Sequence, residues 1–556
     1  MSSKSATVTF TRAITVAPGR FAPGHLGELT QVIPFELVDA ILEETGAVQQ
    51  RLRDLPSRVG MYLLLAMGLF EQAGLAVVWS KLVAGLGGLP MASPSEKALR
   101  DLRRRIGPVP LKALFGVLAG PLAQPHTPGV RYRGMRTVAF DGCSSIKVPD
   151  SARNRWRFGK VKYRMGFAGY PALMLMALVE TGTRAVIGAV FGPTAPGERA
   201  YAEKLLPHLG PGMLVLNDRG FDGNVLLRRI AATRAQFLVR AKASRRPSVD
   251  TVLPDGSYLS RIGGLRLRVI EARITVIGAD GSTVTGIYRL LTTLTDHRTD
   301  PAPVLIDLYR ERWEVESAFF AFRHTILHGR VLRSKDPAGI EQEMWALLAL
   351  YQGLRIVMVD AAESAAGTDP DRCSFTIALE AARDSVVAAN NVVTVDVDLV
   401  GDIGRAVLSG LLPARRPRFS ARKVKSPISR YHAHTDTSRP LTSTTVTGVE
   451  VTVHAAAAPE SWLPDPAKAR RAPRTGRRGR PRPAAGRRAA TRPLGRRDAV
   501  LQLMGTRPGE PWRGRDVARA FGIDDEQGLN SFCVQMSIWS RQGHLTKTRP
   551  ATYQLP

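Results

Sequence analysis

Two short apolar runs, each ending at an aspartate, constrain the fold of this chain more than any other feature. Thr137–Phe140 precedes Asp141, and Met213–Leu216 precedes Asn217 and Asp218. A short apolar run bounded by polar residues is typical of a buried strand. Carboxylates that follow such strands lie at one rim of a sheet, where side chains from distant segments converge. The sequence therefore predicts a mixed α/β core with two acids at the rim of its sheet.

A third acid, Glu316, lies on a long helix predicted to start after Pro303. At about 100° per residue, Tyr309, Arg312, Glu316 and Arg323 would form one polar stripe along this helix. Three converging carboxylates suit Mg²⁺, and two such ions can drive in-line attack on a phosphodiester. The alternatives are a solvated helix face with an Arg312–Glu316 pair, and aspartates that only cap turns.

Charge indicates the class of partner. Lys and Arg number 78 against 48 acids, which gives a formal net charge of +30. Such an excess favours a polyanion, because each neutralised phosphate releases a counterion. The longest uncharged run in the most apolar stretch, Met61–Phe70, is far shorter than the roughly 20 residues that span a bilayer. We therefore expect no membrane partner, and we expect a cytoplasmic location because no apolar signal core precedes Arg20.

Composition divides the chain into segments. The predicted domains are a helical DNA-binding domain (1–130), a mixed core (131–365) with a β-rich insertion at about 242–302, a helical and basic extension (366–435), a disordered basic linker (436–497) and a winged-helix-like module (498–556). Residues 466–497 hold 13 Lys and Arg and no acid, a composition typical of a disordered tether. The predicted fold class is therefore α+β with several domains.

A basic helix in the first domain is a candidate DNA reader. Ser95 is predicted to cap it, and a second apolar helix follows after a Gly-Pro break, as in a helix-turn-helix. In this interpretation Arg100, Arg103 and Arg104 contact DNA. A solvated helix face is an equally good interpretation.

The linker contains a second candidate. Arg478 and Arg480 belong to an Arg-Gly-Arg-Pro sequence like the core of an AT-hook, which places arginines in a narrow minor groove. A generic basic tether is the favoured alternative, since such runs readily produce this tetrapeptide. Either form would bind phosphate.

These motifs resemble a known family. Asp141-Gly142 with Val148-Pro149-Asp150, the block Asp218–Phe221, and the Tyr309, Arg312 and Glu316 set are similar to the motifs of the insertion-sequence-four family of bacterial DDE transposases. In that family a lysine follows seven residues after the glutamate, where this chain has Arg323. The resemblance covers about residues 10–435 and includes the family's N-terminal domain.

The resemblance implies a ribonuclease-H-like core and a DNA transposase that cleaves the inverted-repeat ends of its element and joins them to target DNA. Asp141, Asp218 and Glu316 would hold Mg²⁺ or Mn²⁺, as two ions, in a homodimeric synaptic complex on the bacterial nucleoid. The expected DNA contacts near the site are Tyr309, Arg312, Arg323, Arg219 and Trp313, the last by stacking on a terminal base unless it anchors the core. The rival functions are a non-catalytic DNA-binding regulator derived from a transposase and a nuclease of the same fold.

One aromatic differs from the family pattern. Well-studied relatives stack a flipped base on a tryptophan in the insertion, whereas this chain has no tryptophan between Trp156 and Trp313. Base capture would fall to another aromatic, such as Tyr258 or Tyr288, or would be absent.

Overall fold

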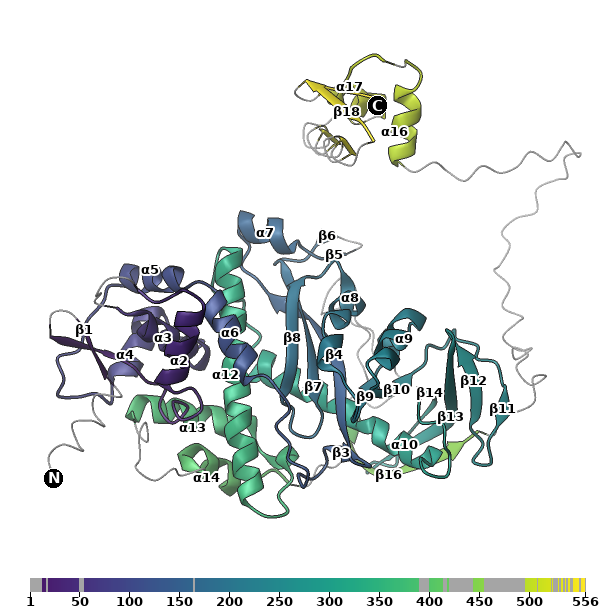
Figure 1. Ribbon diagram of the computed structural model, residues 1–556, viewed down its shortest axis with the longest axis horizontal. Helices are drawn as coiled ribbons and strands as arrows, with labels where there is room; N and C mark the ends of the chain where they lie inside the picture. The colour runs from purple at the N-terminus through teal and green to yellow at the C-terminus, as the bar shows by residue number, and fades with distance from the viewer. Residues whose placement is uncertain are drawn as a thin grey trace, which may run out of the picture. The chain divides into compact units, whose positions relative to one another are not determined.

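Buried strands near the middle of the chain organise the larger of its two units (Figure 1). The structure is a computed structural model that describes residues 13–16, 19–49, 55–163, 166–389, 400–413, 418–419, 444–454 and, with gaps, 496–555. The units are Met1–Leu463 and Pro464–Pro556.

The core of the first unit is a mixed sheet with the strand order β8-β7-β4-β9-β10. Strand β7 is antiparallel to both β4 and β8, whereas β9 is parallel to both β4 and β10. The bounds are β4 (Met135–Lys147), β7 (Ala172–Glu180), β8 (Val186–Pro193), β9 (Met213–Asn217) and β10 (Gln236–Arg240), with β3 (Arg131–Tyr132) beside β4. This arrangement fits the expected ribonuclease-H-like core.

Both faces of this sheet are covered, because alternate side chains enter two different cores. Val138 and Phe140 pack under α8 (Gly197–Glu203) and α9 (Asn224–Ala232). Ala139 packs on the opposite face, with Leu214 and Leu216 of β9. That face lies under α10 (Ala302–Leu308), α11 (Glu314–Phe320) and α12 (Pro337–Ser364).

The first aspartate lies within a strand rather than at its end. Strand β4 continues beyond Asp141 to Lys147, paired with β7 and with an irregular register between Cys143 and Ile146. Its parallel pairing with β9 ends earlier, at Val138. The apolar run thus marks where β4 separates from β9. Beyond it, β4 pairs with β7, and the Lys147 carbonyl at its end accepts the Leu332 N–H at 3.0 Å.

The β-rich insertion lies where the sequence predicts it. It contains β11 (Thr251–Val252), β12 (Tyr258–Ile262), β13 (Leu265–Gly278) and β14 (Thr283–Thr292), and β14 joins it to β10. Strand β12 pairs with the first half of β13.

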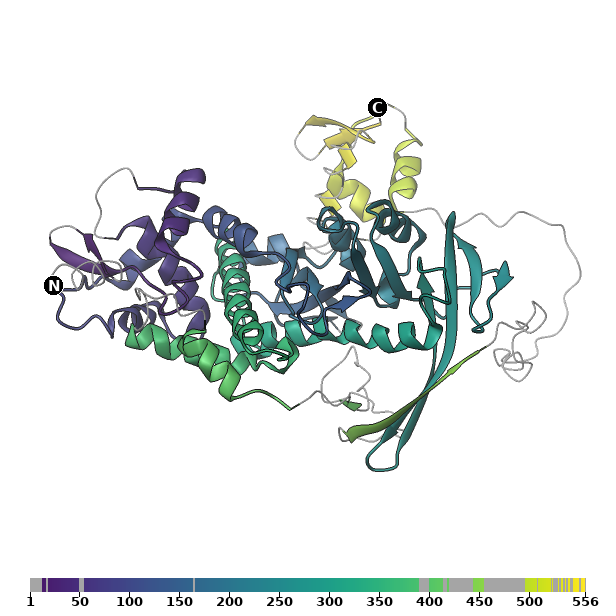
Figure 2. The ribbon, with the colours of Figure 1, turned by 60° about the horizontal axis from the view of Figure 1, so that its bottom comes forward.

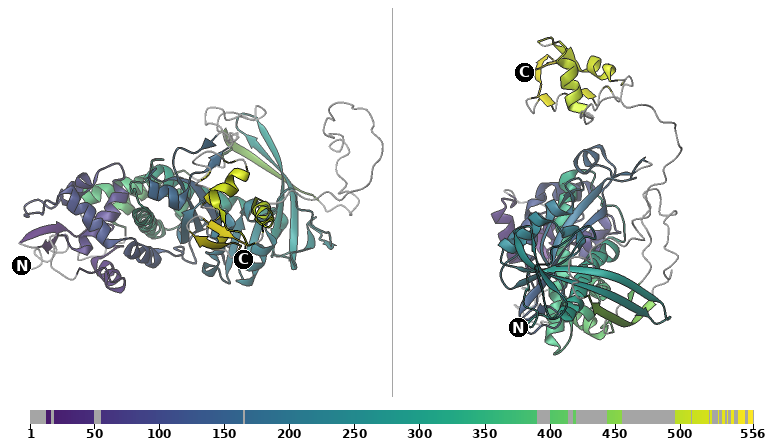
Figure 3. Two further views of the ribbon diagram at one scale, coloured as in Figure 1. Left: turned by 90° about the horizontal axis from the view of Figure 1, so that it is seen from above. Right: turned by 90° about the vertical axis from the view of Figure 1, so that its right-hand side faces the viewer.

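The second half of β13 pairs with a strand from much later in the chain. Strand β16 (Thr444–Val453) runs antiparallel to it, with Ala272 opposite Val453, and short β15 (Arg418–Phe419) pairs with β16. Figures 2 and 3 show β13, β14 and β16 as a ribbon that extends away from the sheet. The prediction of a continuous linker over 436–497 is therefore wrong at β16, whose β-branched sequence finds a partner.

The N-terminal region is mostly helical, as predicted. Its elements are β1 (Ala13–Val16), β2 (Arg20–Pro23), α2 (Phe35–Glu44), α3 (Ser57–Leu69), α4 (Leu75–Val83), α5 (Glu96–Ile106) and α6 (Val109–Leu118). Helices α13 (Phe375–Ala388) and α14 (Gly401–Ser409) pack against it, since Arg383 Nε donates to the Leu69 carbonyl at 2.7 Å and the Asp402 N–H donates to the Glu28 carboxylate at 2.8 Å. The helical part of the extension thus belongs with the first domain.

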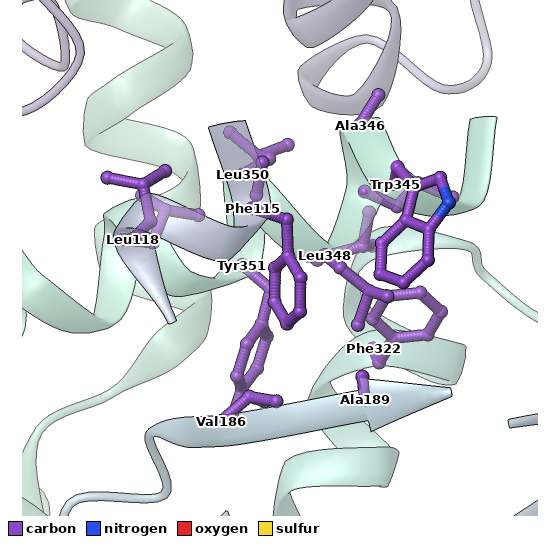
Figure 4. Close-up of a cluster of buried hydrophobic side chains, with 14 of the residues drawn as sticks. Phe115, Leu118, Val186, Ala189, Phe322, Trp345, Ala346, Leu348, Leu350 and Tyr351 are labelled. Carbon is purple, nitrogen blue, oxygen red and sulfur yellow. The ribbon is translucent and has the colours of Figure 1, made fainter. Parts of the chain in front are cut away.

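Helix α12 joins these N-terminal helices to the sheet. Its Trp345 lies between Phe115 of α6 and Phe191 of β8, with ring centroids 5.4 and 4.6 Å away, and Figure 4 shows the surrounding cluster. By length and composition α12 is the one described helix that could cross a membrane, but 89% of its most apolar window is buried inside the protein.

The second unit has its own small core. It contains α16 (Arg496–Met504), β17 (Trp512–Arg513), α17 (Gly514–Ala520), β18 (Thr546–Arg549) and β19 (Thr552–Gln554), with strand order β17-β19-β18. Val500, Val517 and Tyr553 are among its buried side chains. Strands β18 and β19 form a hairpin at the end of this unit, and most of residues 524–543 lie outside the described residues.

Candidate active site

Asp141 and Asp218 lie level with each other on neighbouring strands. Strands β4 and β9 pair in parallel register, and beyond the paired segment the N–H of Phe140 donates to Oδ1 of Asn217 at 3.1 Å. The next residue on each strand is an aspartate. The register therefore sets the two carboxylates side by side at one rim of the sheet.

Side-chain alternation directs both aspartates to the same face. Ala139 and Leu216 precede them by two residues and pack in the core under α11, so Asp141 and Asp218 point toward α11 as well. Glu316 lies on the first turn of α11. The fold thus places Asp141 within electrostatic range of both other acids that the sequence singles out.

The three acids share one electrostatic environment. The pKa of Asp141 is raised to about 7, chiefly by burial; the Gly142 N–H and the Arg312 guanidinium lower it, and the negative charges of Glu316 and Asp218 raise it. Buried like charges of this kind favour a cation between them.

A buried arginine and a buried tyrosine form hydrogen bonds that position this site. Arg312, buried to 10% side-chain exposure, donates from Nη2 to Oε1 of Glu316 at 3.2 Å. Tyr309 is also buried, and its hydroxyl donates to the carbonyl of Asn217 at 3.0 Å. Burial raises the pKa of Tyr309, so the hydroxyl stays protonated as a donor. Tyr309 thereby fixes the backbone next to Asp218.

The predicted single helix is in fact interrupted. A 3₁₀ turn (Tyr309–Trp313) separates α10 from α11, and a π-helical turn (Ala321–Ile326) follows α11. The residues of the polar stripe therefore do not follow the 100° spacing of one α-helix, and Arg323 lies half-exposed in the π-turn. Such π-turns are frequent at functional sites.

Glu198 is a site residue that sequence analysis missed. It lies on α8, across the sheet from α11, and its Cγ lies 2.9 Å from the place where a Cβ on Gly142 would be. Its Oε2 lies 3.7 Å from the corresponding position on Gly220. Burial and the charge of Asp218 raise the pKa of Glu198. A fourth carboxylate therefore reaches the rim, and no local motif in the sequence marks it.

The donor set fits a hard cation, although the acids are not gathered around one. Among the described residues, no three His, Cys, Asp or Glu side chains are grouped to hold a metal ion. Instead, Asp141 Oδ1 accepts the Gly142 N–H at 2.8 Å, and Asp218 Oδ1 accepts the Gly220 N–H at 2.7 Å. Oxygen donors that repel one another suit a divalent ion that would replace these bonds.

Comparisons with known proteins identify the family of the chain. A model described as "Insertion element 4 transposase N-terminal" matches residues 23–116, and a "Transposase DDE domain" matches 132–352. Transposase InsG for insertion sequence element IS4, from Escherichia coli (strain K12), is 28% identical over 355 residues, which cover 61% of this chain and 78% of that protein. The chain belongs to the IS4-family DDE transposases.

Two other proteins are similar to parts of the chain. The putative transposase InsZ of the same strain is 25% identical over 134 residues, which cover 24% of this chain and 44% of that protein. The match to a piggyBac transposase synaptic complex with hairpin DNA covers 70% of this chain and 85% of that chain, with 10% identity and a TM-score of 0.34. The transposase is thus a DNA-cleaving, strand-transferring enzyme by its family, and DDE domains work with divalent metal ions.

The arginines expected to contact DNA have different surroundings. Arg219 is exposed directly after Asp218. Arg100 and Arg104 are exposed on α5, where each pairs with an acid of its own helix. Arg103 instead turns inward to α12, where its guanidinium contacts Glu343 at 2.7 Å. Its position does not support the predicted DNA contact.

The remaining expected contacts are aromatic residues and the linker. Tyr258 is buried, with 1% of its surface exposed, and donates to Glu271 at 2.8 Å. One face of the Tyr288 ring is covered by Arg240, whose guanidinium lies 4.0 Å from the ring centroid. Tyr258 is therefore closed to a base, whereas Tyr288 is partly exposed with one ring face covered. The side chain of Trp313 and both linker arginines, Arg478 and Arg480, lie outside the described residues.

Proposed function

We propose that the transposase holds two Mg²⁺ ions, or Mn²⁺ in their place, with Asp141, Asp218 and Glu316, and that it cuts the inverted-repeat ends of its own element before joining them to target DNA. One observation carries this proposal. Asp141 and Asp218 follow matching positions on two neighbouring strands, and the charges of Asp218 and of Glu316, on the covering helix, both raise the pKa of Asp141. When bound, the ions would supply an activated water and stabilise the leaving 3′ oxygen.

The neighbouring side chains would orient the site and the DNA. Arg312 offsets the charge of Glu316, and Tyr309 holds the backbone before Asp218. Arg219 and Arg323, exposed and half-exposed beside the acids, would bind phosphates on either side of the scissile bond. Glu198 would add negative charge beside Asp218 and strengthen metal binding there.

Further parts of the chain would recognise the DNA. Arg100 and Arg104 on α5 would contact the element's end, and the Arg478 and Arg480 segment would bind phosphate. The C-terminal unit, with its small three-stranded sheet and helices, would act as a winged-helix-like DNA-binding module. Two copies of the chain would hold two ends in a synaptic complex on the nucleoid.

The test is cleavage of a labelled duplex that carries the inverted repeat flanking the gene, with Mg²⁺ or Mn²⁺. The variants are wild type, Glu316→Gln and a matched control, Asp307→Asn, which alters an exposed acid on α10. We expect metal-dependent nicking at the repeat boundary by wild type and the control only. Binding without cutting by wild type would favour the regulator, and equal cutting by Glu316→Gln would contradict the assigned site.

A further inference from the structure

An almost fully exposed tryptophan lies beyond the end of β4. Trp156, on α7 (Ala152–Phe158), is 86% exposed. Phe167 and Tyr170, on and after the short hairpin β5–β6 (Lys162–Tyr163, Gly166–Phe167), are 67% and 46% exposed. Tryptophan is usually well buried because its ring gains more from leaving water than other side chains do. Exposure of this degree therefore indicates an interaction surface for a ligand or another molecule.

The helix that carries this tryptophan is firmly anchored. Asn154 is fully buried, and its Nδ2 donates to the carbonyls of Ser334 at 3.0 Å and Pro149 at 3.1 Å. Ser151 Oγ donates to the Lys335 carbonyl at 2.6 Å. The helix is therefore fixed to the loop that leads from the π-turn to α12, and Trp156 is displayed on a rigid support.

The charges around the ring suit a nucleic acid. Arg153 and Arg157 are exposed and flank Trp156 on one helix face, since residues three and four apart share a face. Arg155 and Lys160 are occupied by Asp150, at 3.0 and 2.7 Å. Aromatic rings between free cations form the usual platform for unpaired bases, because the ring stacks on a base while the cations hold phosphates.

The surface formed by Trp156, Arg153 and Arg157, here called the α7 platform, lies at the same end of the sheet as the candidate active site. Figure 1 shows α7 and the β5–β6 hairpin beyond the ends of β4, β7 and β8. From Asp141 to Lys147, where β4 ends, the strand spans about 20 Å at ~3.3 Å per residue. DNA that enters the site and lies along β4 would pass the platform roughly six or more base pairs from the cleaved phosphate.

We propose that Trp156 stacks on an unpaired base of the DNA substrate, about six or more base pairs from the cleaved phosphate, while Arg153 and Arg157 bind the flanking phosphates. This inference rests on the proposed function, because it needs DNA in the site formed by Asp141, Asp218 and Glu316. A ring can reach a base only where the base leaves the helical stack.

The experiment uses the full chain and a set of duplexes with the flanking inverted repeat, each with one unpaired 2-aminopurine at a different distance from the cleavage site. Affinity is measured by anisotropy and stacking by 2-aminopurine quenching. We expect wild type to quench 2-aminopurine fluorescence only when the unpaired base lies within one range of distances from the cleavage site. Trp156→Ala should lose this quenching and bind the duplex about tenfold more weakly. Trp156→Phe should keep most of both signals. Arg153→Ala and Arg157→Ala should each lower the salt slope of log affinity by about one.

Controls separate the possible failures. Arg405→Ala, which removes an exposed arginine on α14, should change neither signal. Trp156→Ala should keep the melting temperature of wild type because its ring is exposed. If wild type cleaves the duplex but Trp156→Ala binds and quenches as wild type does, this inference is wrong and the proposed function stands. If wild type neither binds nor cleaves the duplex, both are wrong.

Discussion

The hydroxyl of Tyr309 donates to the main-chain carbonyl of Asn217 at 3.0 Å, and so holds the residue that precedes Asp218. Removing this bond should displace the aspartate without touching the DNA. We expect Tyr309→Phe to lower stability by about 1 kcal/mol and the cleavage rate by about tenfold, with little change in DNA affinity.

A matched control exists in the N-terminal helices. There the buried Tyr62 donates to the Ile33 carbonyl, also at 3.0 Å. Tyr62→Phe should cost similar stability and leave the cleavage rate unchanged. Equal losses of cleavage in both variants would show that Tyr309 acts only through overall stability.

Repulsion among the acids predicts a link between metal and stability. We expect Asp141→Asn to be more stable than wild type in the absence of metal, by about 2 kcal/mol, because it removes a charge that burial and two neighbouring acids disfavour. Mg²⁺ should raise the melting temperature of wild type and of Asp307→Asn, but not of Asp141→Asn. Calorimetry with and without Mg²⁺ checks both effects, and an equal Mg²⁺ response in all three proteins would place the ion elsewhere.

Glu198 should tune metal affinity rather than bind DNA. Glu198→Gln removes a negative charge beside Asp218, so the Mg²⁺ concentration for half-maximal cleavage should rise about tenfold. Gly142→Ala should act in the same direction, because its Cβ would meet Glu198 Cγ at 2.9 Å. Glu203→Gln, on the exposed side of the same helix, serves as the control. An unchanged Mg²⁺ dependence in Glu198→Gln would contradict this role.

Two neighbouring arginines of α5 should differ in what their removal weakens, protein stability for Arg103 and DNA binding for Arg104. Arg103→Ala leaves Glu343 without its buried partner and should destabilise the protein by about 3 kcal/mol, as seen in chemical denaturation. Arg104→Ala should leave stability within about 0.5 kcal/mol and weaken binding to the element's end. The reverse pattern would mean that the inward position of Arg103 has no structural role.

Strand β16 should stabilise the outer half of the insertion ribbon. Val449→Pro removes an N–H from the pairing with β13 opposite Val276, so residues near the β13–β14 turn should become more sensitive to limited proteolysis. A substitution to Thr at the same position keeps the β-branched side chain and should retain protection. Equal protease patterns in both variants would show that β13 does not need this partner.

The three candidate acids could be singled out from sequence because each follows a local signal. Apolar runs before Asp141 and Asp218 mark buried strands, and helix periodicity marks the segment of Glu316. The structure adds what local patterns lack, namely the parallel register that sets the aspartates level. Glu198 could not be found in this way, since it lies on α8, on the opposite face of the sheet. Its side chain reaches the rim only because Gly142 has no Cβ in its path.

The other differences between prediction and structure arise from side-chain orientation, from partners far away in the sequence and from breaks in helical geometry. Spacing alone cannot tell that Arg103 turns inward, because its partners on α12 lie more than two hundred residues later in the sequence. Thr444–Val453 alternates like a strand, but its partner is far away and its neighbours are basic, so composition assigns it to the linker. The stripe on the Glu316 helix fails for another reason, since 3₁₀ and π-turns break the α-helical phase.

The pairing of β13 with β16 has a consequence for the nascent chain on the ribosome. The strand that completes β13 is made about 170 residues later, which at 5–20 residues per second is a delay on the order of ten to thirty seconds. Throughout that interval the outer half of β13 presents open N–H and C=O groups, which is the condition under which strands from neighbouring chains join. A gene copy cut short before codon 444 would never close that edge, so premature stops should yield aggregating fragments rather than soluble competitors of the intact enzyme.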